Sequence, residues 1–166
     1  GAVYFRGQVV SGDGEGNLHF WRGGKKINKI SGHHHAAVTS LRAFGSYVDH
    51  SSAALVPKRR IVNSKSNIVK ATSGFVSGSN DKLLIWSTES DEAVVTHTFP
   101  VHTLLAQCGW CPLKFMLNEK MSRTNFITSI DTDPTCDRLV LSFSSSSIVT
   151  LAKDSKTVQK VSEGHS

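Results

Sequence analysis

Two stretches of the sequence share one pattern, and each of them ends on a tryptophan. The stretches are residues 11–21 and 77–86. In both, small residues close one predicted strand, a turn rich in Gly, Asn and Asp follows, and a strand with alternating apolar residues runs to the Trp. Gly-His pairs stand at Gly32-His33 and again near the last residue, at Gly164-His165. A recurring pattern of this kind indicates a repeat architecture, in which each unit packs against its neighbours.

The repeats predict an all-β fold, a β-propeller built from four-stranded WD-type blades. A blade needs about 40–45 residues, and propellers close with typically 4–8 of them. A chain of 166 residues therefore has room for about three blades. We expect an open β-propeller fragment that forms part of a larger propeller.

Strand and turn signals divide the sequence into three predicted blades and two insertions. The first insertion is far longer than a hairpin turn needs, and only residues 104–121, in the second insertion, could hold a short helical turn. The third predicted blade lacks the turn Asp and the Trp at the strand end. The predicted units are blade 1 (1–31, partial, with a truncated first strand), blade 2 (32–100, with a basic insertion at 46–72), an inserted loop (101–124), blade 3 (125–163) and the start of a next blade (164–166).

The polar residues of blade 2 predict a structural hydrogen-bond network. A carboxylate can orient an imidazole, whose second nitrogen reaches a hydroxyl group that also meets the indole N–H. His34 and His35 compete with His33 for the imidazole position, and the sequence alone does not choose among them. A hydrolase would use the same residue types, but a strand that ends on Trp is not a nucleophile elbow. The candidate network residues are His33, Ser77, Ser79, Asp81 and Trp86, with Trp21 at the corresponding place in blade 1.

Positive charge is concentrated in the first part of the chain. Residues 1–70 carry eleven Lys and Arg against three acidic residues, a balance of +8, whereas residues 71–166 have a balance of −2. Such a balance favours acidic partners, and cationic loops on a rigid scaffold can bind them. No aromatic residues alternate with the cations, which disfavours nucleic acid. A merely solvated insertion remains the other interpretation of the candidate acidic-partner loop, whose cations are Lys58, Arg59, Arg60, Lys65 and Lys70.

The cysteine and histidine residues do not predict a cofactor or a metal site. Cys108 and Cys111 have the spacing of a zinc knuckle, but the chain offers no second pair of this kind. Adjacent residues of an extended chain point to opposite faces, so the three consecutive His residues do not converge on one ion. Three cysteines are too few for a disulfide framework and suit a reducing cytoplasm. The apolar runs are too short to cross a bilayer, so we expect no membrane partner.

The repeats resemble those of WD-repeat proteins, and in particular the echinoderm microtubule-associated protein-like family. Residues 9–21, VVSGDGEGNLHFW, resemble the family blade "VVTGDSGGNIxVW", in which Gly also replaces the usual turn Asp, here at Gly16. Residues 75–86 resemble the next family blade, and residues 127–165 resemble a blade that lacks the Trp and ends in Gly-His. The two insertions depart from the family pattern, as does the Ser-Asn before Asp81.

This resemblance implies a non-catalytic scaffold that associates with tubulin and microtubules in the cytoplasm, at the cytoskeleton, the spindle or the cilium. It also implies that further blades, from the same protein or from neighbouring chains, complete the propeller. The residues themselves leave two alternative functions open. One is a general WD-repeat adaptor in another multiprotein complex, and the other is a zinc-dependent or hydrolytic enzyme built on the Cys/His loop.

Overall fold

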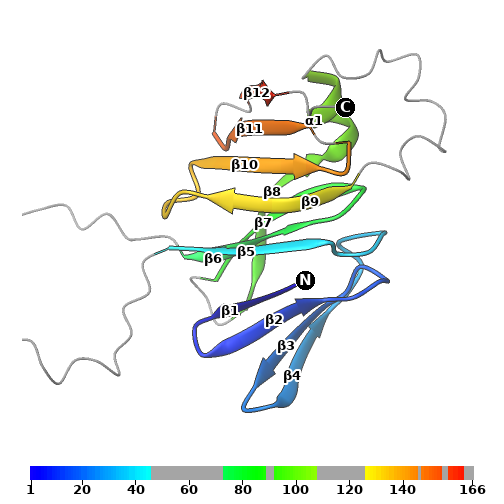
Figure 1. Ribbon diagram of the computed structural model, residues 1–166. Helices are drawn as coiled ribbons and strands as arrows, with labels where there is room; N and C mark the ends of the chain where they lie inside the picture. Colours follow the sequence, from blue (N-terminus) through cyan, green and yellow to red (C-terminus); the bar gives the residue numbers. More distant parts are fainter. Residues whose placement is uncertain (46–72, 89–91, 108–125, 146, 155–156, 163–166) are drawn as a thin grey trace, which may run out of the picture.

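The protein folds into three four-stranded antiparallel sheets, shown by a computed structural model in Figure 1. The structure describes residues 1–45, 73–88, 92–107, 126–145, 147–154 and 157–162. Within each sheet the strands follow one another in chain order, so that each sheet is a meander of hairpins. This is the topology of a propeller blade. The fold is an open β-propeller fragment in which blade 2 lies between blades 1 and 3 (Figure 1).

Each blade contributes four strands, and one short helix follows the second blade. The strands of blade 1 are β1 (Ala2–Phe5), β2 (Gln8–Gly12), β3 (Leu18–Arg22) and β4 (Lys25–Ile30). Those of blade 2 are β5 (Ser40–Phe44), β6 (Gly74–Gly78), β7 (Lys82–Ser87) and β8 (Val94–Pro100), followed by helix α1 (Val101–Gln107). Those of blade 3 are β9 (Ile127–Thr132), β10 (Arg138–Phe143), β11 (Ile148–Ala152) and β12 (Thr157–Ser162).

Blade 2 is buried on both faces because a sheet packs against each of them. Every residue of β6 is buried, and so are four consecutive residues of β7. In blade 1, by contrast, β3 alternates: Leu18 and Phe20 are buried, while His19 and Trp21 are partly exposed. The near-continuous apolar run of β7 thus marks the central sheet, and the alternation in β3 marks a sheet with one covered face.

Two apolar clusters hold the blades together. The first joins blade 1 to blade 2 and is centred on Phe75, whose ring stacks on that of Trp86 with centroids 5.5 Å apart. The second joins blade 2 to blade 3 and also includes buried residues of α1. Blade 2 therefore turns its Trp86 face toward blade 1, and in blade 3 Leu141 and Leu151 take the corresponding place, facing blade 2.

The first strands of the blades, β1, β5 and β9, lie next to one another (Figure 1). The connections between strands then gather at two opposite ends of the sheets. We call the end with the β1–β2, β3–β4 and β7–β8 turns the hairpin rim. The opposite end, which carries the loop between β4 and β5, is called the histidine rim. Gly45 and Ser73, which flank the segment 46–72, both lie at the hairpin rim.

The first sheet contains four strands, and its first strand, β1, pairs with β2 along all of its four residues. One element boundary differs from the sequence prediction. Helix α1 occupies the beginning of the segment 101–124, which was predicted as a loop. Its buried residues Val101, Leu104 and Leu105 recur at helical spacing and close the end of the second cluster.

Candidate functional site

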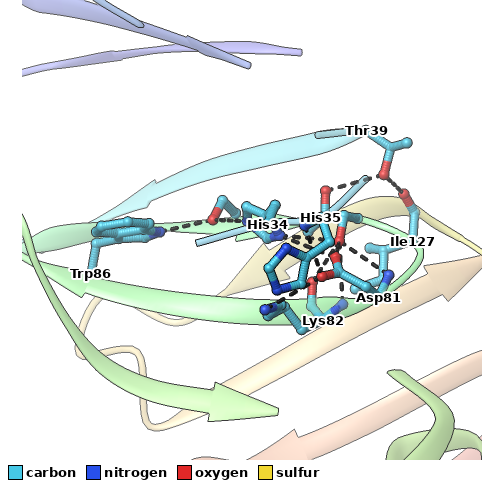
Figure 2. Close-up of polar contacts among 10 residues, drawn as sticks. His34, His35, Thr39, Asp81, Lys82, Trp86 and Ile127 are labelled. Atoms are coloured by element: carbon cyan, nitrogen blue, oxygen red, sulfur yellow. Dashed lines mark hydrogen bonds and ion pairs between the residues drawn. The ribbon is translucent and has the colours of Figure 1, made fainter. Parts of the chain in front are cut away.

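A buried polar network runs through blade 2, from the β6–β7 turn to Trp86 in β7 (Figure 2). Ser77 lies in β6 and is fully buried. The indole N–H of Trp86, in β7, donates a hydrogen bond of 2.8 Å to the Ser77 Oγ atom. The two strands are hydrogen-bonded neighbours, and Phe75 and Trp86 are cross-strand partners. The strand pairing therefore fixes the distance between the indole and the hydroxyl group.

His34 joins this pair to the turn between β6 and β7. Its ring is buried, with Nε2 2.8 Å from the Ser77 Oγ and Nδ1 3.0 Å from the Ser79 Oγ. The Asp81 carboxylate lies 3.4 Å from the same Nδ1 atom and also accepts a hydrogen bond from the Ser79 hydroxyl. His34, which is distant in the sequence, thus meets Ser77, Ser79 and Asp81 of the β6–β7 hairpin.

Every polar atom of the network has a partner when the imidazole is neutral and carries its proton on Nδ1. The Trp86 N–H then donates to Ser77, and the Ser77 hydroxyl donates to His34. The Nδ1–H of His34 donates to Ser79, whose hydroxyl donates to Asp81. Because no donor or acceptor is left unpaired, the network can be buried without a large desolvation penalty.

Asp81 fixes the loop that carries the histidines. Its second oxygen accepts the backbone N–H of His35 at 3.0 Å and lies 3.4 Å from the Lys82 Nζ. Partial burial acts to raise the pKa of Asp81, but the hydrogen bonds from His34, Ser79 and His35 outweigh it and hold the pKa below its ordinary value. The carboxylate therefore stays ionised and anchors the loop.

The structure places His34, and not His33, in the network. His33 is exposed, and its ring lies edge-on against the Trp86 ring with centroids 5.0 Å apart. The loop that carries His34 passes close to Gly16 in the β2–β3 turn of blade 1. Gly16 has a φ of 87°, and a Cβ atom there would lie 2.7 Å from the His34 carbonyl oxygen, so a residue with a side chain at position 16 would push the loop outward.

Blade 1 contains a related network, of which the sequence predicted only Trp21. The Trp21 N–H donates to the Ser11 Oγ at 2.9 Å, as Trp86 does to Ser77. At the first turn position, however, Asp13 replaces Ser79, and its carboxylate accepts from the Asn17 side chain and lies 2.8 Å from the His19 Nε2. Hydrogen bonds from Asn17 and His19 hold the pKa of Asp13 below its ordinary value. The signal was available in the Asp-x-Glu-x-Asn sequence, which is typical of an Asx turn.

The order Ser–His–Asp in blade 2 does not form an accessible reactive centre. The Ser77 Oγ and His34 Nε2 are at hydrogen-bond distance, as in a hydrolase. Ser77 and the His34 ring are buried, however, and Ser77 already accepts the Trp86 N–H. A substrate could reach the hydroxyl group only if blades 1 and 2 separated. The geometry therefore supports a structural role for these residues.

Several predicted candidates lie outside the described residues. They include the cations Lys58, Arg59, Arg60, Lys65 and Lys70 and the cysteines Cys108 and Cys111. Across the described ranges there is no group of three or more His, Cys, Asp or Glu residues that could hold a metal ion. Within the same ranges, no helix combines the length and apolar character that a bilayer crossing requires.

Cys136 is the cysteine that the structure does describe. It is free, fully buried and in the β9–β10 turn with a φ of 59°. Burial raises the pKa of the Cys136 thiol, which keeps it protonated and unreactive at neutral pH. This cysteine packs as a small apolar residue within the second cluster.

The chain of hydrogen bonds from an indole through Ser and His to a turn Asp is the one expected of a WD-repeat blade. No protein-family model matches the sequence, and no curated protein matches it. Among solved structures, the chain is similar to the β-propeller domain of Cps50 (Swd1) from Myceliophteria thermophila, with a TM-score of 0.39 and 15% sequence identity. The match covers 98% of this chain and 55% of the Cps50 chain, so this chain spans about half the length of that structure.

Proposed function

We propose that the protein is a non-catalytic WD-repeat scaffold that associates with microtubules. The observation that carries the proposal is a strongly basic first part, with a balance of +8 over residues 1–70, attached to rigid propeller blades. A rigid scaffold holds its loops in fixed positions, and cationic loops on it attract an acidic surface at long range. The acidic surface of tubulin is a partner of this kind.

The non-catalytic part of the proposal rests on the buried network. The Ser, His and Asp residues that a hydrolase would need are used to join β6, β7 and the histidine loop. A blade of this kind presents its rims and loops to partners, while its interior only maintains the geometry. The protein would thus act by binding and not by converting a substrate.

The microtubule part rests on the resemblance of residues 9–21 to a blade of the echinoderm microtubule-associated protein-like family. The basic insertion 46–72, with Lys58, Arg59 and Arg60 at its centre, begins and ends at the hairpin rim, between Gly45 and Ser73. In this proposal the insertion meets tubulin, and the protein works at the cytoskeleton, in the cytoplasm, the spindle or the cilium. Further blades of the same protein or of neighbouring chains would complete the propeller.

The test is co-pelleting of the full-length protein with taxol-stabilised microtubules. We expect pelleting at low salt, a decrease as salt screens the charges, and a loss in the variant with Lys58, Arg59 and Arg60 all changed to Glu. A full-length protein that stays in the supernatant at low salt would exclude microtubule association. Partners recovered from another complex would then favour the general adaptor, and stoichiometric zinc in the purified protein would favour the zinc-dependent alternative.

A further inference from the structure

We infer that a groove between blades 1 and 2 binds an acidic peptide segment that carries an apolar side chain. The groove opens at the hairpin rim and has a volume of ≈ 280 Å³. Blade 1 supplies most of its lining, and Thr88 and Ala93 from the β7–β8 connection supply the rest. Sites for drug-sized ligands have volumes of about 300–1,000 Å³, so this groove suits one or two side chains of a peptide. The inference goes beyond the proposed function, because any acidic protein partner of a scaffold could use the site.

The base of the groove is apolar and rigid. Phe5 and Phe20 line it, and both are largely buried, at 8% and 7% exposure. Their rings meet Phe75 edge-on, with centroids 6.4 and 6.1 Å away, so they cannot turn without disturbing the first cluster. Ile27, on the edge strand β4, is 49% exposed at the groove. A partner's apolar side chain would remove this exposed surface from water.

Arg6 holds the two walls of the groove at a fixed separation. Its guanidinium group donates to the Thr88 carbonyl oxygen and, at 2.6 Å, to the Ser73 Oγ, both in blade 2. The backbone of Arg6 has a φ of 48°, a left-handed conformation that is unfavourable for a residue with a side chain. The contacts across the interface offset this cost. The groove is therefore formed before any partner arrives, which lowers the entropy lost on binding.

The blade 1 wall carries cations that are available to a ligand. Arg22, at the end of β3, lines the groove, and Lys25 is its cross-strand partner on β4. Both side chains are exposed, and neither forms an ion pair with another residue that the structure describes. A guanidinium group presents paired donors that match a carboxylate. The charge of this wall thus favours the Asp and Glu residues of a partner.

The blade 2 side of the groove is lined by the uncharged residues Thr88 and Ala93, which gives the ligand a direction. The carboxylates of the peptide would therefore lie over Arg22, and its apolar side chain would lie toward Ala93. A nucleic acid or an anionic membrane is less suitable, because each presents a long array of negative charge to both walls.

The experiment measures binding of a fluorescein-labelled peptide in which a single Phe is flanked by Glu residues. Fluorescence anisotropy with the full chain should show binding at low salt. Arg22→Glu should weaken it about tenfold or more, the effect of losing a charge-assisted hydrogen bond. Arg138→Glu makes the same change of charge on the exposed end of β10 in blade 3 and should leave the affinity within about twofold, because screening limits its reach.

Three outcomes would overturn the inference. They are an equal loss in Arg22→Glu and Arg138→Glu, unchanged binding when the peptide's Phe is replaced by Ser, and tighter binding of a single-stranded oligonucleotide or of anionic vesicles than of the peptide. Far-UV circular dichroism would confirm that each variant is folded. The result is independent of the microtubule test, since peptide binding requires Arg22 whereas the proposed tubulin contact requires Lys58, Arg59 and Arg60. Either can fail while the other holds.

Discussion

Ser77 shows how one hydroxyl group can join three elements. It accepts the indole N–H of Trp86 and contacts the His34 ring, and it has no exposed surface. Ser11 makes the same bond to Trp21 in blade 1, but both residues there are partly exposed. The same Ser–Trp hydrogen bond thus occurs once in the buried interior, in blade 2, and once at a partly exposed position, in blade 1.

The first prediction compares these two serines. Ser77→Ala should lower the free energy of unfolding by about 2 kcal/mol, because it leaves the Trp86 N–H and the His34 Nε2 without partners in the interior. Ser11→Ala should cost below about 1 kcal/mol, since water can replace the lost acceptor of Trp21. Urea titration followed by tryptophan fluorescence measures both. Equal losses in the two variants would contradict the structural network of blade 2.

The second prediction concerns Asp81 and pH. Its pKa in the folded state lies below the ordinary value, so its contribution to stability is present above pH 4 or so and is lost as pH falls below that. Asp81→Asn should therefore lower the unfolding free energy by about 2 kcal/mol at pH 7 and by much less at about pH 2. Asp154→Asn, on the exposed β11–β12 turn, is the control. A difference between the wild-type protein and Asp81→Asn that stays constant with pH would contradict the predicted role of the carboxylate.

At the scale of the strands, blades 1 and 2 also share the position at which the strand pairing is irregular. The register between β3 and β4 shifts between Phe20 and Trp21, and the register between β7 and β8 shifts between Ile85 and Trp86. In both sheets the bulge comes directly before the Trp. A bulge increases the local twist of a strand pair. The outer strand is therefore twisted at the same position in each of these two blades.

The third prediction concerns the start of β6. A Cβ atom on Gly74 would lie 1.9 Å from the Trp86 carbonyl oxygen and 2.8 Å from the Phe44 ring. Gly74→Ala should therefore push β6 away from β7 and cost about 2 kcal/mol or more. Gly14→Ala, in the β2–β3 turn, has no atom within 4 Å of the added Cβ and should change stability by less than about 0.5 kcal/mol. Thermal unfolding of both variants tests this, and a tolerated Gly74→Ala would show that the two strands lie farther apart.

At the scale of the whole molecule, the two faces of blade 1 differ. Its inner face meets blade 2 through the first cluster. Its outer face bears a cross-strand row formed by Tyr4, Val9 and Trp21. The corresponding row in blade 2 includes Phe75 and Trp86, which are almost completely buried because blade 1 covers them. The outer face of blade 1 thus has the composition of a blade interface, with Tyr4 64% and Val9 38% exposed.

The fourth prediction follows from that exposed row. The chain should associate with itself in a concentration-dependent way, because contiguous exposed apolar residues favour contact between molecules. Tyr4→Lys should shift sedimentation velocity profiles toward the monomer. Val94→Lys, which replaces an apolar residue of β8 that is 54% exposed, should leave the profile unchanged. A wild-type chain that remains monomeric at all concentrations would contradict the prediction.

The sequence by itself determined the class of fold and the group of polar residues around Trp86. The repeat ending on Trp21 and Trp86 specifies strands and turns, because alternation and turn residues act over a few neighbouring positions. Ser77, Ser79, Asp81 and Trp86 could be grouped for the same reason: they lie within one hairpin, where pairing fixes their distances.

Only the tertiary structure decided which histidine enters blade 2 and which surfaces remain open. The loop that carries His34 packs closely against Gly16 in another blade, a contact that no local pattern encodes. The hydrogen bond from Arg6 to blade 2 and the groove beside Arg22 likewise arise where two blades meet. Short-range patterns set the elements, but the packing of distant residues sets their relative positions, and the binding surfaces follow from that packing.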